Sequence, residues 1–293
     1  MSLKEHSLIV SLTVNKPQLT KKDDKATRDA EDANNARGAG QFRKELYPKH
    51  LIAPITQVES SARAYIERCT YPWARGEYLL PTTRFMDFAD RVGKYELEFS
   101  QCVTAFLNNW SNVMLEAQQR QGALFDAAAY PDLTALKSDF RFRVTYRPVT
   151  DTADFRVAMQ ESEMSLLTQQ VEAATKESMN TLLRAPLERL REVVAKLQEV
   201  TSKDERAVMN KKTGREEIKP PIFRDSVVDN IIEEISLLRD FAAAMPESVL
   251  GLAEDLASVT PAAEVLRSSR EVREITNQNA STLLAAIDEM LEG

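Results

Sequence analysis

Three arginines alternate along a strand-like segment near the middle of the chain, from Asp139 to Val149. Arg141, Arg143 and Arg147 fall on one face of that segment. Alternate residues of a strand lie ~6 to 7 Å apart, a spacing that matches successive phosphates along one nucleic-acid strand. Arg156, on the expected partner strand, is a fourth candidate contact. This pattern makes single-stranded DNA or RNA a candidate ligand.

The aromatic residues of the same segment argue against nucleic-acid binding. Phe140, Phe142 and Tyr146 occupy the opposite face, so a buried aromatic face leaves no stacking platform beside the arginines. The arginines then have a second use, because they can pair with acidic helices of the chain itself. Basic residues near the N-terminus complete the candidate nucleic-acid site: Lys21, Lys22 and Lys25.

Catalytic patterns are nearly absent from the sequence. The two histidines, His6 and His50, have no plausible metal ligand or triad partner nearby in sequence. The glycine-rich patterns of phosphate-binding loops, G-x-x-x-x-G-K-[ST] and G-x-G-x-x-G, do not occur in the sequence. Acidic pairs such as Glu233-Glu234 are typical of solvated helix faces. We therefore predict no enzyme activity, no catalytic residue, no metal and no cofactor.

Composition favours a helical protein of the cytoplasm. The net charge is −7, and glycine is scarce at 8 of 293 residues. Cys69 and Cys102 are too few for a disulfide framework. No stretch approaches the roughly 18 to 20 apolar residues of a membrane span, and the segment 1–15 lacks a signal-peptide layout. From 221 to 293 we count five basic and fourteen acidic residues, a local charge of −9, so the remainder carries +2.

Two long apolar seams dominate the pattern of the chain. Steps of three and four residues run from Phe85 to Ala117 and, with one phase shift ahead of Pro186, from Met164 to Leu197. We predict that these two helices pack on one another. The residues assigned to this packing seam are Phe85, Phe88, Val92, Phe99, Phe106, Trp110, Leu167, Val171, Leu183, Leu187, Leu190 and Leu197.

The fold class that follows is mainly α: a long antiparallel, coiled-coil-like helical hairpin with a small antiparallel β element and a C-terminal helical module. A strand at 7–14 is expected to join the hairpin at 139–159. The predicted organisation has an N-terminal strand and mobile segment (1–50), the helical hairpin (51–205), a linker (206–222) and an acidic helical module (223–293).

Two short motifs carry a resemblance to a known family. Gly76-Glu77-Tyr78-Leu79-Leu80-Pro81 precedes the aromatic helix, and Phe223 to Asn230 (FRDSVVDN) opens the acidic module. In these motifs the chain resembles bacteriophage and bacterial proteins that share a domain of unknown function. Their genes often neighbour those of a MoxR-type AAA ATPase and a von Willebrand factor A protein. The resemblance implies a phage-type protein of the host cytoplasm with an ATPase as partner, and it implies no catalytic residue.

Three hypotheses about function follow from the sequence. The leading one is a non-enzymatic, oligomer-forming structural or interaction component, motivated by the apolar seams and an open sheet edge. The second is a nucleic-acid-binding protein that uses the arginine face. An enzyme of unrecognised type is the residual alternative.

Overall fold

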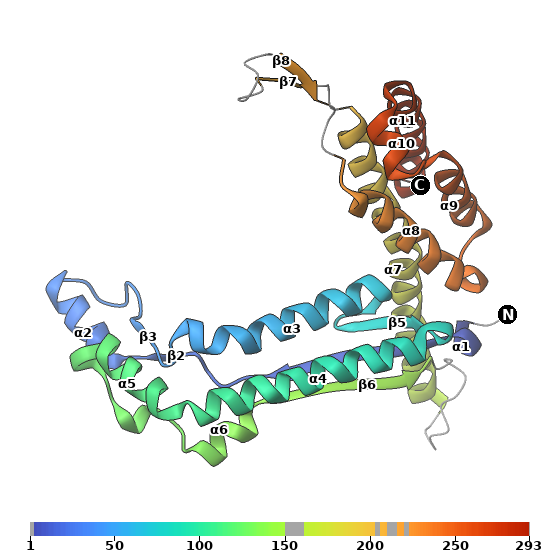
Figure 1. The fold of residues 1–293 in the computed structure, drawn as a ribbon. Coiled ribbons are helices and arrows are strands. Elements are labelled where there is room, and N and C mark those ends of the chain that lie inside the picture. The colour runs from blue at the N-terminus through green and yellow to red at the C-terminus, as the bar shows by residue number, and fades with distance from the viewer. Residues whose placement is uncertain (1–2, 150–160, 203–205, 210–215, 220–222, 293) are drawn as a thin grey trace. The chain divides into compact units, whose positions relative to one another are not determined.

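The structure is a computed structural model that describes residues 3–149, 161–202, 206–209, 216–219 and 223–292. It is mainly helical with small sheets, as predicted (Figure 1). Contacts divide the chain into two compact units with interleaved segments. We call Val10–Arg68 with Phe85–Tyr146 the sheet unit, and Met1–Ile9 with Cys69–Arg84 and Arg147–Gly293 the helical unit.

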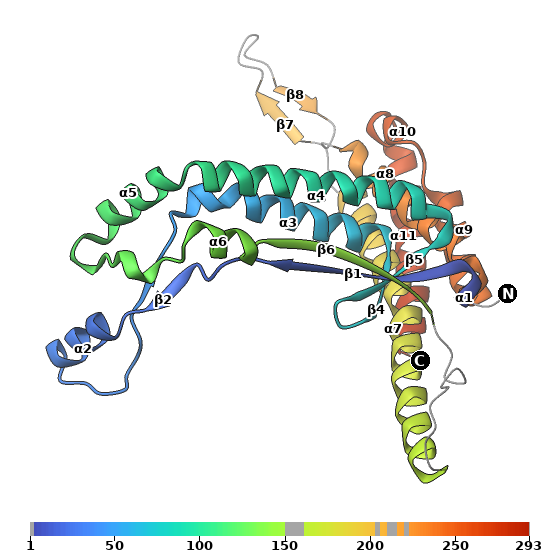
Figure 2. The ribbon, with the colours of Figure 1, turned by 90° about the horizontal axis from the view of Figure 1, so that it is seen from below.

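The sheet unit is built on two long helices that run side by side along a pair of strands (Figures 1 and 2). The strands β1 and β6 are neighbours in a sheet, which confirms that the N-terminal strand joins the central one. A two-stranded antiparallel ribbon, β2 with β3, pairs Lys22 with Arg43. The elements of this unit are β1 (Ser7–Asn15), β2 (Thr20–Lys22), α2 (Asp24–Ala33), β3 (Arg43–Glu45), α3 (Lys49–Cys69), α4 (Phe85–Asn108), α5 (Trp110–Gln121), α6 (Leu133–Asp139) and β6 (Arg141–Pro148).

The apolar seam of α4 is covered inside the sheet unit. Phe88 stacks on Tyr65 of α3 with ring centroids 5.7 Å apart, and Phe99 meets Phe142 of β6 at 5.5 Å. Phe85 likewise meets the ring of Tyr146 at 5.3 Å. The seam is therefore apolar because α3 and β6 lie on it, and the helical hairpin predicted from the two seams is not confirmed.

The predicted continuous helix from Phe85 to Ala117 is interrupted. α4 ends at Asn108, and α5 begins at Trp110. Asparagine side chains compete with the backbone for hydrogen bonds, so Asn108-Asn109 is a weak point in a helix. Trp110 keeps an aromatic environment, with Tyr47 and Phe106 within 6.2 Å of its ring.

The helical unit surrounds one 41-residue helix, α7 (Glu161–Thr201), which continues through Pro186. α7 packs on α8, α11 and β4. Its C-terminal half supplies Leu187, Leu190 and Leu197 to the core, and Leu182 is buried where Leu183 was predicted. The side chains of Leu167 and Val171 lie outside the described residues. The remaining helices of the unit are α1 (Leu3–His6), α8 (Asp225–Asp240), α9 (Glu247–Val259), α10 (Ala263–Ser268) and α11 (Arg270–Glu292).

Two hairpins of the helical unit were not anticipated from the sequence. β4 (Tyr71–Ala74) pairs antiparallel with β5 (Glu77–Pro81) around Gly76, whose φ of 76° is the left-handed conformation that glycine adopts without strain. Inside the segment predicted as a linker, β7 (Arg206–Met209) pairs antiparallel with β8 (Glu216–Lys219). The expected partner strand at 154–159 lies outside the described residues.

Candidate functional site

The arginine face of β6 has the alternation predicted from the sequence. Arg141 and Arg143 are exposed, and Phe142 between them is buried against α4. Neither of these two arginines has an ion pair with a described residue. Arg147 instead forms an ion pair with Glu77 of β5, so it is partly neutralised within the helical unit. Arg156 lies outside the described residues, and within the described part of the face Arg141 and Arg143 are the unpaired cations.

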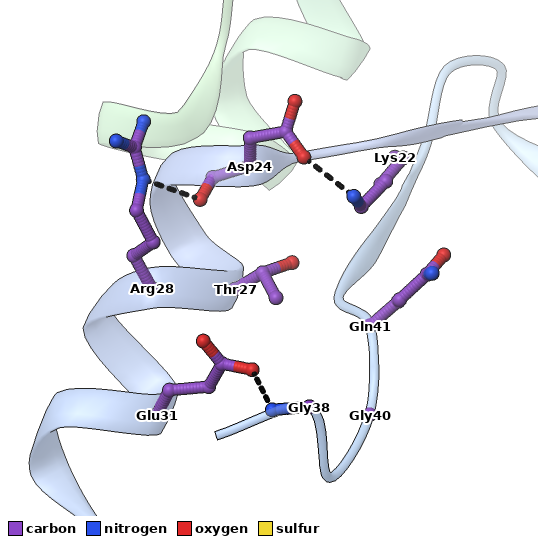
Figure 3. Close-up of a pocket in the computed structure, with 8 residues that line it drawn as sticks. All are labelled: Lys22, Asp24, Thr27, Arg28, Glu31, Gly38, Gly40 and Gln41. Atoms are coloured by element: carbon purple, nitrogen blue, oxygen red, sulfur yellow. Dashed lines mark hydrogen bonds and ion pairs between the residues drawn. The ribbon is translucent and has the colours of Figure 1, made fainter. Parts of the chain in front are cut away.

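The predicted N-terminal lysines lie on a different part of the sheet unit. Lys22 lines an open cavity of about 630 Å³ between α2 and the loop that follows it (Figure 3). Lys22 pairs with Asp24 at 2.8 Å, and this cation lowers the pKa of the Asp24 carboxyl. Glu31 accepts a hydrogen bond of 2.7 Å from the backbone N–H of Gly38 across the cavity. Lys21 and Lys25 are exposed but do not line it.

This cavity is a poor fit for a polyanion. Its two cations, Lys22 and Arg28, are matched by the carboxylates of Asp24 and Glu31. The sheet unit as a whole has seventeen basic and sixteen acidic residues, a charge of +1. Non-specific nucleic-acid binding depends on uncompensated positive charge. The structure thus leaves Arg141, Arg143, Lys21 and Lys25 as the members of the predicted basic site that have no ion pair among the described residues.

A second candidate surface in the sheet unit is the outward side of α4. Met86 is 75% exposed and Leu97 is 60% exposed, which is unusual for large apolar side chains. They are eleven residues apart, about three helical turns, and so lie on one side of the helix. Gly93 is on the same side, and apart from its chain neighbours and its own helix backbone no described atom lies within 4 Å of where its Cβ would be. Beside it, Asp90 and Lys94 form an exposed ion pair of 2.6 Å.

A third candidate is an apolar groove in the helical unit. It has a volume of about 400 Å³ and lies between α8 and the residues that join α9 to α10. Ile232 is 58% exposed there, and Arg239 lines the groove at the C-terminal end of α8. The lining includes Val228, Ile231, Ile232, Ile235, Pro261 and Ala262. Volumes of this order are typical of ligand pockets.

The helix that carries the groove is fixed from its other side by buried polar groups. The hydroxyl of Tyr71 in β4 donates to Glu234 Oε1 at 2.6 Å. Arg189 of α7 lies over the Tyr71 ring at 4.8 Å, and its Nη1 is 3.8 Å from Glu234 Oε2. Burial raises the pKa of Glu234, and it raises the pKa of the Tyr71 hydroxyl as well. Both shifts have a structural explanation in the packing of α8.

The described part of the chain has neither a metal-ligand cluster nor a membrane-spanning helix. There, no three His, Cys, Asp or Glu side chains are grouped so that they could hold a metal ion. His50 lies 3.4 Å from Glu116 and is exposed. None of the helices in the described ranges has the length and apolarity needed to cross a bilayer.

Neither the groove nor the α4 surface was predicted from the sequence. The signal for the α4 surface was present, because Met86 and Leu97 fall outside the apolar seam of their own helix. The groove had no such signal, since part of its lining comes from α9 and the α9–α10 connection, which are distant in sequence from α8. No protein-family model, curated protein or solved structure matches the chain.

Proposed function

We propose that the chain is a non-enzymatic interaction protein that forms oligomers, and that two copies associate through the outward side of α4. The observation that carries this proposal is the exposure of Met86 and Leu97 on either side of Gly93. A glycine inside a helix costs about 1 kcal/mol relative to alanine. No described neighbour of Gly93 requires the missing side chain, so close approach of a second helix supplies the reason for it.

The sequence of this surface suits a second copy in antiparallel orientation. With a two-fold axis midway between Arg91 and Val92, Met86 lies level with Leu97 of the partner subunit. Gly93 then lies level with Asp90 of the partner subunit. The apolar residues of each copy are ~16 Å apart along the helix. Each copy thus covers both exposed apolar side chains of the other.

The charges beside the glycine are complementary in the same arrangement. Lys94 lies level with Ala89 of the partner subunit and so comes beside the partner's Asp90. The Asp90–Lys94 pair inside each copy is exposed and contributes little by itself. Two such pairs facing one another form a network of four alternating charges, which favours this register over a shifted one.

The mass of the purified protein tests this proposal. Light scattering over a range of micromolar concentrations is expected to show mass rising above that of one chain. Leu97→Glu is expected to return the protein to a monomer, because it places an acid in the apolar contact. Leu115→Glu is the matched control, since Leu115 is 54% exposed on α5 and outside this surface. A strictly monomeric wild type, or equal masses for wild type and Leu97→Glu, contradicts the proposal.

The resemblance noted in the sequence adds a proposed partner and setting. We propose that the oligomer works in the host cytoplasm with a MoxR-type ATPase, the partner that the resemblance implies. Size-exclusion chromatography of the two purified proteins tests this directly. Co-elution with wild type supports the partnership, and separate elution removes it whatever the oligomeric state of this chain.

A second candidate function is nucleic-acid binding through β6. Its specific observation is that Arg141 and Arg143 are both exposed without an ion pair among the described residues. Titration with single-stranded and duplex DNA at two salt concentrations is the test. Binding that weakens with salt and is reduced by Arg141→Ala with Arg143→Ala supports it. Arg43→Ala is the control for charge, and a lack of binding at low salt removes this candidate.

A further inference from the structure

We infer that the groove of the helical unit binds an amphipathic helix with basic flanks, supplied by a different protein. The groove is a separate surface from α4, in the other unit of the chain. Its floor is formed by Val228, Ile231 and Ile235 of α8, which are buried. Ile232 projects beside them and is exposed, so an apolar surface is already assembled without a covering element among the described residues.

The shape of the groove favours a helix as the occupant. Its lining residues on α8 recur at 228, 231, 232, 235 and 239, which is a single straight side of that helix. From 228 to 239 this side is ~16 Å long, about three helical turns. Pro261 and Ala262 form part of the opposite wall. A helix laid between two such walls presents its own apolar residues at matching intervals of three and four.

The charges around the groove select a basic occupant. Asp229 is exposed on α8 one turn before Ile232, and Glu254 is exposed on α9 one turn before the lining residue Ala257. The helical unit has twenty-one basic and twenty-nine acidic residues, a charge of −8. A second copy of the same surface would bring carboxylates against carboxylates. Lysines or arginines beside the apolar residues of the occupant instead meet Asp229 and Glu254.

Arg239 determines the orientation of the bound helix in the groove. It is exposed at the end of the groove, and no described residue forms an ion pair with it. A single cation at one end of a groove suits the carbonyl groups or an acidic residue at the C-terminal end of a bound helix. The bound helix therefore runs with its C-terminus toward Arg239 and its basic residues beside Asp229.

A pair of designed peptides tests this inference. Each is a labelled helix of roughly 18 residues with leucines at positions i, i+3 and i+7. One carries lysines beside the leucines, and the other carries glutamates at the same positions. Fluorescence anisotropy with the full chain is expected to show at least tenfold tighter binding of the lysine peptide, weakening as salt rises. Equal affinity for the two peptides, or no binding of either, overturns the inference.

Variants of the chain locate the binding. Ile232→Glu is expected to weaken binding of the lysine peptide roughly tenfold or more, because it places an acid in the apolar groove. Asp229→Lys with Glu254→Lys is expected to weaken it as well, whereas Glu289→Lys with Glu292→Lys, the same charge change on α11, leaves it unchanged. Leu97→Glu is expected to bind the peptide like wild type, which separates this site from self-association. Binding that Ile232→Glu leaves unaltered places the peptide elsewhere and overturns the assignment.

Discussion

The hydroxyl of Tyr71 donates a 2.6 Å hydrogen bond to the buried carboxylate of Glu234, which joins two segments 163 residues apart. Tyr71 is in the β4–β5 hairpin and Glu234 is in α8. Arg189 of α7 completes the contact by donating to the carbonyl oxygen of Thr70 at 2.7 Å while it covers the Tyr71 ring. The hairpin, α7 and α8 are therefore held together by one buried polar cluster, and α8 is the helix on which the groove is built.

Tyr71→Phe is expected to destabilise the helical unit by about 1 to 3 kcal/mol. The change removes the donor and leaves an oxygen of Glu234 buried without it. The two tryptophans allow the units to be followed separately, because Trp73 is in the helical unit and Trp110 in the sheet unit. Urea unfolding in a Trp110→Phe background reports the helical unit alone. Tyr146→Phe, in the sheet unit, is the control and should leave this transition in place.

The raised pKa of Glu234 predicts how stability depends on pH. Burial is the largest cause and disfavours the carboxylate, against the hydrogen bond from Tyr71 and the charge of Arg189, which lower the pKa. The folded unit thus holds this proton at pH values where the unfolded chain has released it. Stability from this group is complete below the ordinary pKa of 4.5 and is lost as pH rises through the folded value.

Comparison with Glu234→Gln isolates this effect, because glutamine does not titrate. The free energy of unfolding of wild type minus that of Glu234→Gln is expected to fall as pH rises from about 4.5. Urea midpoints measured across this range, with Trp73 as reporter, give the difference. A difference that grows with pH contradicts the prediction, and it means that Tyr71 and Arg189 together outweigh burial.

Periodicity predicted the positions of the helices better than it predicted the elements that pack on them. The three-four spacing along 85–108 correctly marks one side of α4 as buried, and the alternation of β6 correctly separates Phe142 from Arg143. The spacing shows only that one face of a helix or strand is apolar. It does not say whether that face meets a strand or a helix. The seam of α4 was therefore predicted to pack on a second long helix, whereas aromatic residues of β6 pack on it.

The candidate sites depend even more on contacts between residues that are far apart in sequence. Arg147 looked equivalent to Arg141 and Arg143, but its partner Glu77 is 70 residues away in the β4–β5 hairpin, which was not predicted. Local patterns carry no information about such a pair. Short strands were missed for a related reason, since four-residue segments such as β7 and β8 offer too few residues for a period to be recognised.

Core truncations are expected to affect the two units separately. Leu190→Ala removes a fully buried side chain of α7, and Phe99→Ala removes a buried ring of α4. We expect losses of about 2 to 5 kcal/mol and about 3 to 5 kcal/mol respectively. Unfolding should move to lower urea at Trp73 for the first variant and at Trp110 for the second. Equal shifts at both tryptophans for either variant contradict separate units and indicate a single cooperative transition.

Gly93→Ala is expected to change stability and self-association in opposite directions. Its Cβ meets no described atom within 4 Å, so the helix of a single copy gains up to about 1 kcal/mol. In the proposed pair of α4 helices the same methyl group separates the backbones and weakens the contact between copies. Thermal unfolding of dilute protein together with light scattering at high concentration measures both. A variant that is more stable and associates as strongly as wild type removes the close approach at Gly93.

Reversal of the Asp90–Lys94 pair tests the register of the proposed association. Asp90→Lys alone places two lysines beside one another across the interface, and Lys94→Asp alone places two aspartates there, so each is expected to weaken association. The double variant restores opposite charges both within each helix and between copies. Its mass in solution is therefore expected to return toward that of wild type, as a double-mutant cycle requires for groups in contact. The Leu97→Glu substitution, which acts through the apolar contact, should not be rescued by the reversal. If the double variant is as impaired as the single ones, Asp90 and Lys94 act only within their own helix, and a different register of the two copies has to be sought.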